Sequence, residues 1–99
     1  MATTNDIYAE MQRYAPLELA ESWDNPGLLV DCGREVSRVL VTLDITPEVV
    51  EEAAAGGCEL IVSHPPVIFS PLKKLPPRDV SFQLVQKGIS AICMHTNLD

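Results

Sequence analysis

The chain has few basic residues: Lys and Arg together number 7, Asp and Glu 14, and the net charge is −7 at pH 7. This balance argues against nucleic acid or an anionic membrane surface as a partner, because both attract positive charge. Long apolar runs are also missing, since no segment reaches the roughly 18 residues needed to span a bilayer. The opening MATTNDIYAE lacks a basic region followed by an apolar one, so we expect no secretory signal.

Cysteine is scarce as well. Cys32, Cys58 and Cys93 are odd in number and form no closely spaced pair, so neither a disulfide framework nor a zinc ribbon is implied. Cys93 stands inside an apolar run and is predicted to be a small buried residue. A Gly-rich phosphate loop of the P-loop type is also absent. We therefore expect a cytoplasmic protein without a dedicated triphosphate loop.

The chain contains enough apolar sequence for one modest domain. Its 99 residues are 46% hydrophobic and 21% charged, which is typical of soluble globular proteins. Helical spacing, β-branched runs and turn residues define the elements. We predict a helix over 6–14 capped by Asn5 or Thr4, a short apolar run over 28–30, a strand over 38–44, a helix between Thr46 and Gly56-Gly57, and then a strand over 59–64, a helix over 81–88 and a strand over 89–95. Two successive βαβ units predict an α/β fold with a largely parallel sheet and helices on its faces.

The three predicted parallel strands end in Asp44, His64 and His95. Ligands of open parallel sheets bind beyond the carboxyl ends of the strands, so these side chains are expected to converge. After His64, Pro65 and Pro66 cannot extend a ladder and hold the histidine in an extended conformation at the strand end. Asp44 is better explained by turn and cap hydrogen bonds than by a ligand role.

The last five residues, HTNLD, allow two interpretations. If they stay extended, His95, Asn97 and Asp99 face one side and form a plausible set of ligands for a divalent ion. Asn and Asp also favour turns, and taken alone that interpretation is the better one. Upstream, Trp23 and Asp24 precede Asn-Pro-Gly and predict a tight turn, with Trp23 as a packing anchor.

Three stretches, APLELAESWDNPGLLVD, VSRVLVTLDITPEVVEEAAAGGCELIVSHPPVIFSPLKKL and AICMHTNLD, together resemble the N-terminal part of the Nif-three-like family of dinuclear-metal-centre proteins. Bacterial members of that family are commonly labelled type 2 GTP cyclohydrolase I homologues. The resemblance implies an α/β subunit of a homohexamer that binds two divalent ions at the strand ends. It does not distinguish zinc, iron, manganese and magnesium. On this basis, residues 1–99 are expected to be the N-terminal part of a single domain that is truncated at the HTNLD motif.

The resemblance also implies roles for individual residues. His64 matches the first of two adjacent histidine ligands and Asp99 matches an aspartate ligand, whereas His95 and Asn97 are expected to orient ligand or substrate. The second histidine falls on Pro65, which has no donor atom. Family members also run on to a histidine and a glutamate that complete the two-metal site, whereas this sequence ends at Asp99.

Two functional hypotheses follow. The first is a divalent-metal-binding protein with hydrolase-like chemistry on a nucleotide or phosphoester, whose site is incomplete in these 99 residues. The alternative is a non-catalytic scaffold or regulatory protein that keeps the fold and has lost the metals, which Pro65 favours. We also expect the run AICMH to form an exposed edge strand, and the chain to self-associate through it or to be only marginally stable.

Overall fold

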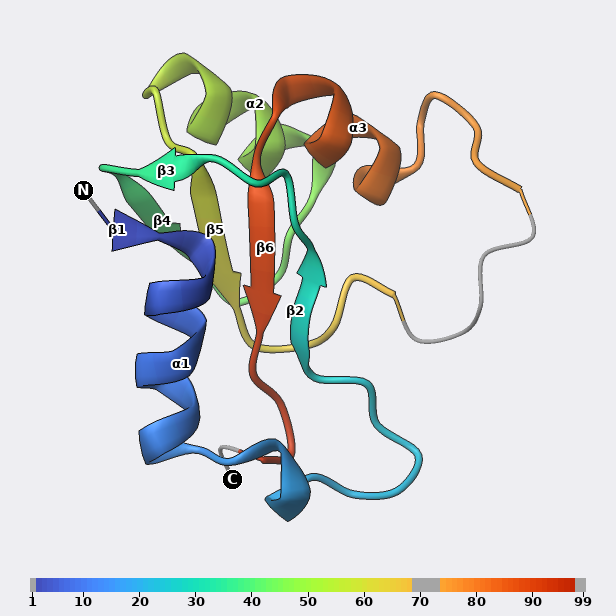
Figure 1. Ribbon diagram of the computed structural model, residues 1–99. Helices are drawn as coiled ribbons and strands as arrows, with labels where there is room; N and C mark the ends of the chain where they lie inside the picture. The colour runs from blue at the N-terminus through green and yellow to red at the C-terminus, as the bar shows by residue number, and fades with distance from the viewer. Residues whose placement is uncertain (1, 69–73, 98–99) are drawn as a thin grey trace.

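The computed structural model describes residues 2–68 and 74–97. Its principal sheet has four strands in the order β2-β6-β5-β4 (Figure 1). The strands are β2 (Gly27–Val30), β4 (Val39–Val41), β5 (Leu60–Ser63) and β6 (Ser90–Cys93), and the α-helices are α1 (Thr4–Tyr14), α2 (Pro47–Ala55) and α3 (Val80–Lys87). A short 3-10 helix, η1 (Leu17–Leu19), follows α1, and two short strands, β1 (Ala2–Thr3) and β3 (Glu35–Val36), pair antiparallel. The predicted α/β fold is confirmed.

Strand β6 lies in the middle of the sheet. It pairs parallel with β5 and antiparallel with β2, while β5 also pairs parallel with β4. All four residues of β6 are buried, and Cys93 has no exposed surface, as predicted. The expectation that AICMH forms an exposed edge was wrong, because β2, which contains the short apolar run predicted over 28–30, pairs with the side of β6 that faces away from β5. Within the described part of the chain, the edges are β4 and β2.

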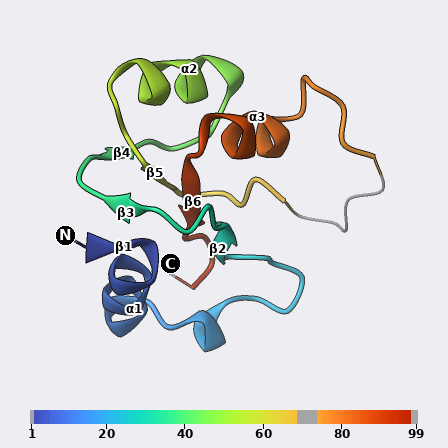
Figure 2. The same cartoon turned by 45° about the horizontal axis from the view of Figure 1, so that its top comes forward.

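Helices cover both faces of the sheet (Figure 2). On one face, α2 and α3 bury a cluster that includes Val50, Leu84 and the strand residue Ile61. On the other face, Leu60 and Ile92 pack towards α1. The alternation follows from the strand period of two, which sends neighbouring side chains to opposite faces. No helix in the described ranges is long and apolar enough to cross a membrane.

The first residues of helices α1 and α2 are set by N-cap side chains. Helix α2 begins after Thr46, whose hydroxyl accepts from the N–H of Val49, and Pro47 occupies its first turn as predicted. Helix α1 begins two residues earlier than predicted, because Thr3 rather than Asn5 or Thr4 is the N-cap. Thr3 and Asp6 form a reciprocal capping box, which satisfies two backbone donors at once.

Strand β4 is shorter than the predicted strand over 38–44. The strand ends at Val41, although Thr42 N–H still donates to the carbonyl of Val62 at 2.9 Å. The chain then bends at Leu43 and Asp44, where the hydroxyl of Thr42 donates to the backbone carbonyl of Asp44. Asp44 is exposed in this turn ahead of α2. The turn interpretation of Asp44 therefore agrees with its position.

Candidate functional site

The site is built where parallel strands β5 and β6 end. Backbone hydrogen bonds continue one step past each strand: His64 N–H donates to the carbonyl of Leu43 at 3.0 Å, and Met94 N–H donates to that of Ser63 at 2.9 Å. The residues that follow these strands are therefore still held in register. This places His64 and His95 beside each other at the same edge of the sheet, as the convergence of strand ends predicted.

The two imidazoles are in contact. The ring centroids of His64 and His95 lie 5.0 Å apart at an interplanar angle of 88°, which is an edge-to-face arrangement. Trp23 meets His95 in a similar way, with centroids 5.9 Å apart. The Trp23 residue is 62% exposed, so it is not the packing anchor that was predicted. Trp23 instead forms part of the surface beside the histidine pair.

Asp24 anchors His95. One carboxylate oxygen lies 3.0 Å from His95 Nδ1 and also accepts from the N–H of Asn25 at 2.9 Å. The other accepts from the N–H of Thr96 at 2.9 Å and from its hydroxyl at 2.6 Å. The Asp24 side chain is fully buried, while that of His95 is 22% exposed. The turn lies at Ser22 and Trp23, before the predicted Asn-Pro-Gly position, and it brings the Asp24 carboxylate to a residue 71 positions away.

The electrostatics of Asp24 follow from these contacts. Burial by itself would raise the pKa of the carboxyl, because it penalises the charged form. Hydrogen bonds from the side chain and backbone of Thr96, from His95 and from the backbone of Asn25 outweigh burial and hold the pKa of Asp24 well below its ordinary value. Asp24 is therefore ionised at neutral pH.

The segment after His95 turns rather than extending. Asn97 Oδ1 accepts from the N–H of His95 at 2.9 Å, and the Asn97 amide donates to the carbonyl of Ala15 at 2.9 Å. Asn97 is buried and points towards Ala15, so the extended course on which the ligand interpretation depends is not found over residues 95–97. The competing interpretation, that Asn favours a turn here, describes the backbone correctly.

The other positions of the predicted ligand set are Asp99 and Pro65. Asp99 lies outside the described residues, and Pro65 follows His64 directly without a donor atom. Within 2–68 and 74–97, no three His, Cys, Asp or Glu side chains are grouped closely enough to hold a metal ion. His64 remains a predicted ligand, and His95 and Asn97 remain predicted orienting residues.

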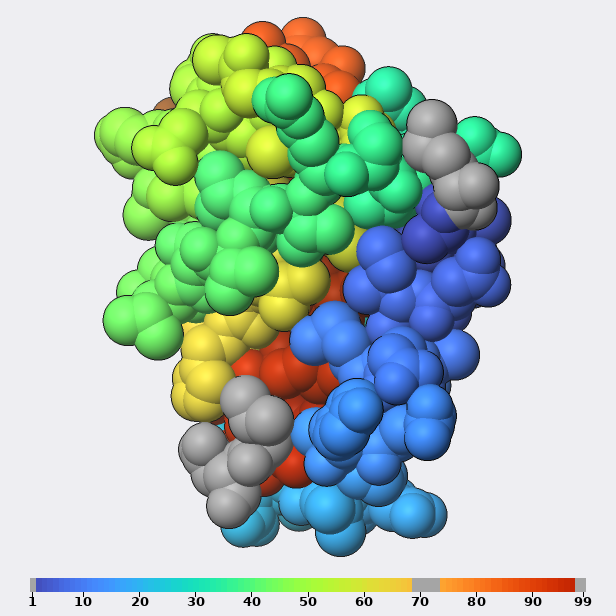
Figure 3. Space-filling model, turned by 90° about the vertical axis from the view of Figure 1, so that its left-hand side faces the viewer, coloured from blue at the N-terminus to red at the C-terminus, as the bar shows by residue number. Residues whose placement is uncertain are grey.

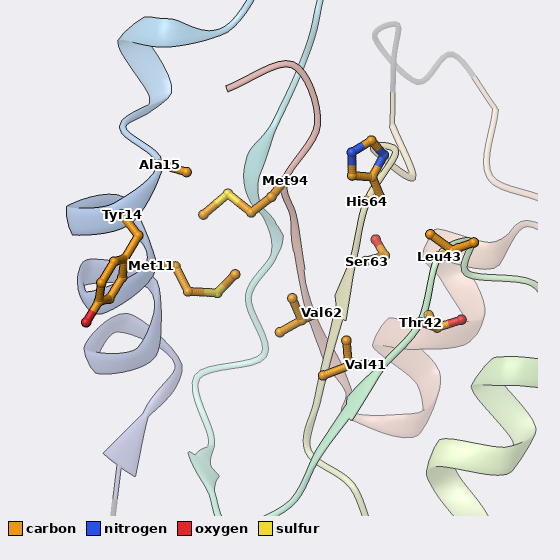
Figure 4. A pocket seen from close by; sticks show the side chains of 10 residues that line it. All are labelled: Met11, Tyr14, Ala15, Val41, Thr42, Leu43, Val62, Ser63, His64 and Met94. Atoms are coloured by element: carbon orange, nitrogen blue, oxygen red, sulfur yellow. The ribbon is translucent and has the colours of Figure 1, made fainter. Parts of the chain in front are cut away.

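An apolar groove of about 370 Å³ opens beside His64, between α1 and strand β4. Figure 3 shows yellow and red atoms of the β5 and β6 region between the green atoms of the β4 segment and the blue atoms of α1. In Figure 4, Met11 and Tyr14 lie on the α1 side and Val41 and Leu43 on the β4 side, with His64 at the end of β5. The remaining lining residues are Ala15, Thr42, Val62, Ser63 and Met94.

Sequence reasoning missed the pairing of Trp23 and Asp24 with His95. The available signal was the pair itself, an aromatic residue and a carboxylate immediately before a turn. A turn motif, however, does not specify which distant segment its side chains meet. Only the antiparallel pairing of β2 with β6 brings the residues before β2 next to those after β6.

Comparisons with known proteins identify similar sequences and a similar fold. The Duf34/NIF3 (NGG1p interacting factor 3) family model matches residues 2–99. A Helicobacter pylori protein named GTP cyclohydrolase 1 type 2 is 41% identical over 104 residues, which cover 100% of this chain and 42% of that protein. A Staphylococcus aureus protein named GTP cyclohydrolase 1 type 2 homolog is 43% identical over 98 residues, which cover 95% of this chain and 27% of that protein.

A crystal structure of a Staphylococcus aureus hypothetical protein superimposes with a TM-score of 0.88 at 42% identity, covering 96% of this chain and 33% of that one. The chain therefore spans less than half the length of each of these relatives.

Proposed function

The chain belongs to the Duf34/NIF3 family, and from this premise we propose that it binds a divalent metal ion and contributes to hydrolase-like chemistry on a nucleotide or phosphoester. The family resemblance carried by the WDNPG, SHPP and HTNLD segments is confirmed by the match over residues 2–99. The relatives named GTP cyclohydrolase 1 type 2 support the reaction class.

One observation carries the proposal. The imidazoles of His64 and His95 meet at the carboxyl ends of two adjacent parallel strands, 5.0 Å apart between centroids. This is the edge at which open parallel sheets bind their ligands. A neutral imidazole is also the commonest protein ligand for transition metals.

The donors fit part of a metal site rather than a whole two-metal centre. His64 is the proposed ligand from the described residues, and Asp99 is the second by family resemblance. A catalytic zinc usually has three protein ligands and a water, and Pro65 contributes none. When bound, such an ion lowers the pKa of a coordinated water to near 7. We therefore expect no metal-dependent hydrolysis from these 99 residues alone.

The groove beside His64 does not by itself favour a triphosphate. Among the described residues that line it, none is Lys or Arg. A nucleotide substrate would have to find its phosphate contacts elsewhere, and the substrate is proposed only at the level of nucleotide or phosphoester. We further propose a cytoplasmic location and, for the whole protein, assembly into the homohexamer that the family resemblance implies.

The second candidate function is a scaffold or regulatory protein that keeps the fold without the metal. Pro65 is the observation that favours it, because proline occupies the position of a predicted ligand.

A zinc titration distinguishes the two functions. The chain has two histidines, so the imidazole nitrogens can be followed individually by NMR. We expect Zn²⁺ to shift the ring nitrogens of His64 and His64→Ala to weaken binding by about tenfold or more. Pro65→His is expected to strengthen binding, because it adds a donor next to His64.

Pro77→His is the matched control, since it adds an imidazole at an exposed loop position. A wild-type chain that binds no Zn²⁺, combined with a Pro65→His variant that does, would favour the scaffold. If neither protein binds Zn²⁺, Mn²⁺ or Fe²⁺, the metal proposal is wrong for this chain.

A further inference from the structure

The hydrogen bonds of Asp24 determine which nitrogen of His95 carries a proton. The backbone N–H groups of Asn25 and Thr96 both donate to this carboxylate, and backbone donors cannot reverse their role. The carboxyl is also ionised, since hydrogen bonding holds its pKa below the ordinary value. An ionised carboxylate only accepts hydrogen bonds. The 3.0 Å contact with His95 Nδ1 therefore requires a hydrogen on Nδ1.

The same network also fixes the direction of the carboxylate. The Thr96 hydroxyl accepts from the N–H of Glu21 at 2.8 Å and donates to Asp24 at 2.6 Å. The carboxylate is thereby held between the segment before β2 and the turn after β6, and its side chain is fully buried. Such a carboxylate has little freedom to rotate away from the imidazole.

We propose that Asp24 is a positioning residue that holds His95 of the candidate site in the tautomer protonated at Nδ1. In that tautomer, Nε2 is the ring nitrogen that bears the electron pair, and the ring lies beside His64. The use of that nitrogen towards an ion or substrate rests on the proposed function, whereas the tautomer does not. In water, a free neutral histidine favours the opposite tautomer, with the hydrogen on Nε2. Carboxylates that orient histidines in this way are common behind metal-binding and catalytic imidazoles.

The test is a measurement of the His95 tautomer in the metal-free 99-residue chain by ¹⁵N NMR. The pH is set to roughly 8.5, about two units above the ordinary histidine pKa, so that the ring is neutral. His64→Gln assigns the two rings. We expect wild-type His95 to favour the Nδ1–H form by about tenfold or more, the factor given by a hydrogen bond to a charged group.

Asp24→Asn is expected to shift His95 towards the Nε2–H form, because the amide presents an NH₂ group where two acceptor oxygens are needed. Asp31→Asn is the matched control, since Asp31 is exposed and accepts from Gly33 N–H, and it should leave the tautomer unchanged. Thr96→Val should preserve the Nδ1–H form, because it removes the hydroxyl and keeps the Asp24 contact.

A wild-type ring that is mainly Nε2–H overturns the proposal, and so does an Asp24→Asn variant that folds and keeps the wild-type tautomer. If Asp24→Asn does not fold, the wild-type spectrum and Thr96→Val decide the question. Because no metal is present, the result is independent of the zinc titration. The positioning role and the metal-binding function can therefore fail separately.

Discussion

Asp24 receives four hydrogen bonds from three residues, and this concentration gives it an effect on stability as well as on the site. Its carboxylate is buried and has a pKa lowered by those bonds. A group with a lowered pKa in the folded state stabilises that state above its unfolded pKa, here 3.8. The stabilisation is lost progressively as the pH falls below that value.

We predict that Asp24→Asn lowers the free energy of unfolding by about 2 kcal/mol at pH 7, the typical effect of removing a charged hydrogen-bond acceptor. The difference between wild type and variant should shrink as the pH is lowered from about 4 to about 2, because the unfolded wild-type chain then takes up a proton that the folded chain binds only at lower pH. Urea unfolding at several pH values measures it. Asp6 and Glu59, whose pKa values are also lowered, are present in both proteins and cancel. A difference that is constant over this range would contradict the assignment.

At the scale of the elements, helix ends depend on local backbone chemistry. Helix α3 is capped at its N-terminus by Asp79, whose carboxylate accepts from the N–H groups of Ser81 and Phe82, and at its C-terminus by Gly88, with φ of 69°. This left-handed conformation strains any residue with a Cβ. A Cβ at Gly88 would also lie 3.0 Å from Nη1 of Arg34.

Gly88→Ala is predicted to lower the free energy of unfolding by about 1 kcal/mol or slightly more. Gly33 has the same φ of 69°, but a Cβ there would meet nothing within 4 Å. Gly33→Ala therefore measures the conformational cost alone, and the excess in Gly88→Ala measures the displacement of Arg34. Thermal or urea unfolding of both variants tests this. Equal stability of wild type and both variants would show that these turns relax at no cost.

At the scale of the whole molecule, exposed apolar side chains lie on the face between α1 and β4. Val41 and Leu43 are 77% and 75% exposed, and Tyr14 across the groove is 79% exposed. Among the described strands of the main sheet, β4 also pairs on one side only. An apolar face beside an unpaired strand edge favours association with another chain.

We therefore expect the 99-residue chain to self-associate through the β4 side, rather than through β6 as the sequence had suggested. Val41→Lys should shift the population towards monomer, because a charge on an edge strand opposes pairing. Val85→Lys is the control, since Val85 is 61% exposed on α3 and does not line the groove. Sedimentation velocity over a range of concentrations gives the distribution. A monomeric wild-type chain, or equal effects of both variants, would contradict this prediction.

The local sequence was sufficient for the helices and for the parallel part of the sheet. Thr46-Pro47 and Gly88 mark helix ends by chemistry that acts within one turn, and the prolines after His64 end a strand in the same way. The convergence of His64 and His95 was also predictable, because the carboxyl ends of adjacent parallel strands share one edge.

The distant residues that the turns contact could not be predicted from the local sequence. An extended course would have placed Asn97 beside His64, but Asn97 turns back to the carbonyl of Ala15. Trp23 was expected to be a packing anchor but lies exposed against His95. These outcomes depend on contacts between segments more than 70 positions apart in the chain, which no local spacing encodes.

The sequence by itself therefore determined the α/β class, the family and the strand ends that carry the two histidines, because periodicity, capping and short motifs act over a few residues. The tertiary structure alone decided that β2 pairs with β6, so that β6 lies inside the sheet, and that the Asp24 carboxylate contacts the His95 ring. It also decided that the apolar groove lies at β4. The physical reason is that antiparallel pairing and burial join distant segments, and the energy of such contacts appears only when the chain has folded.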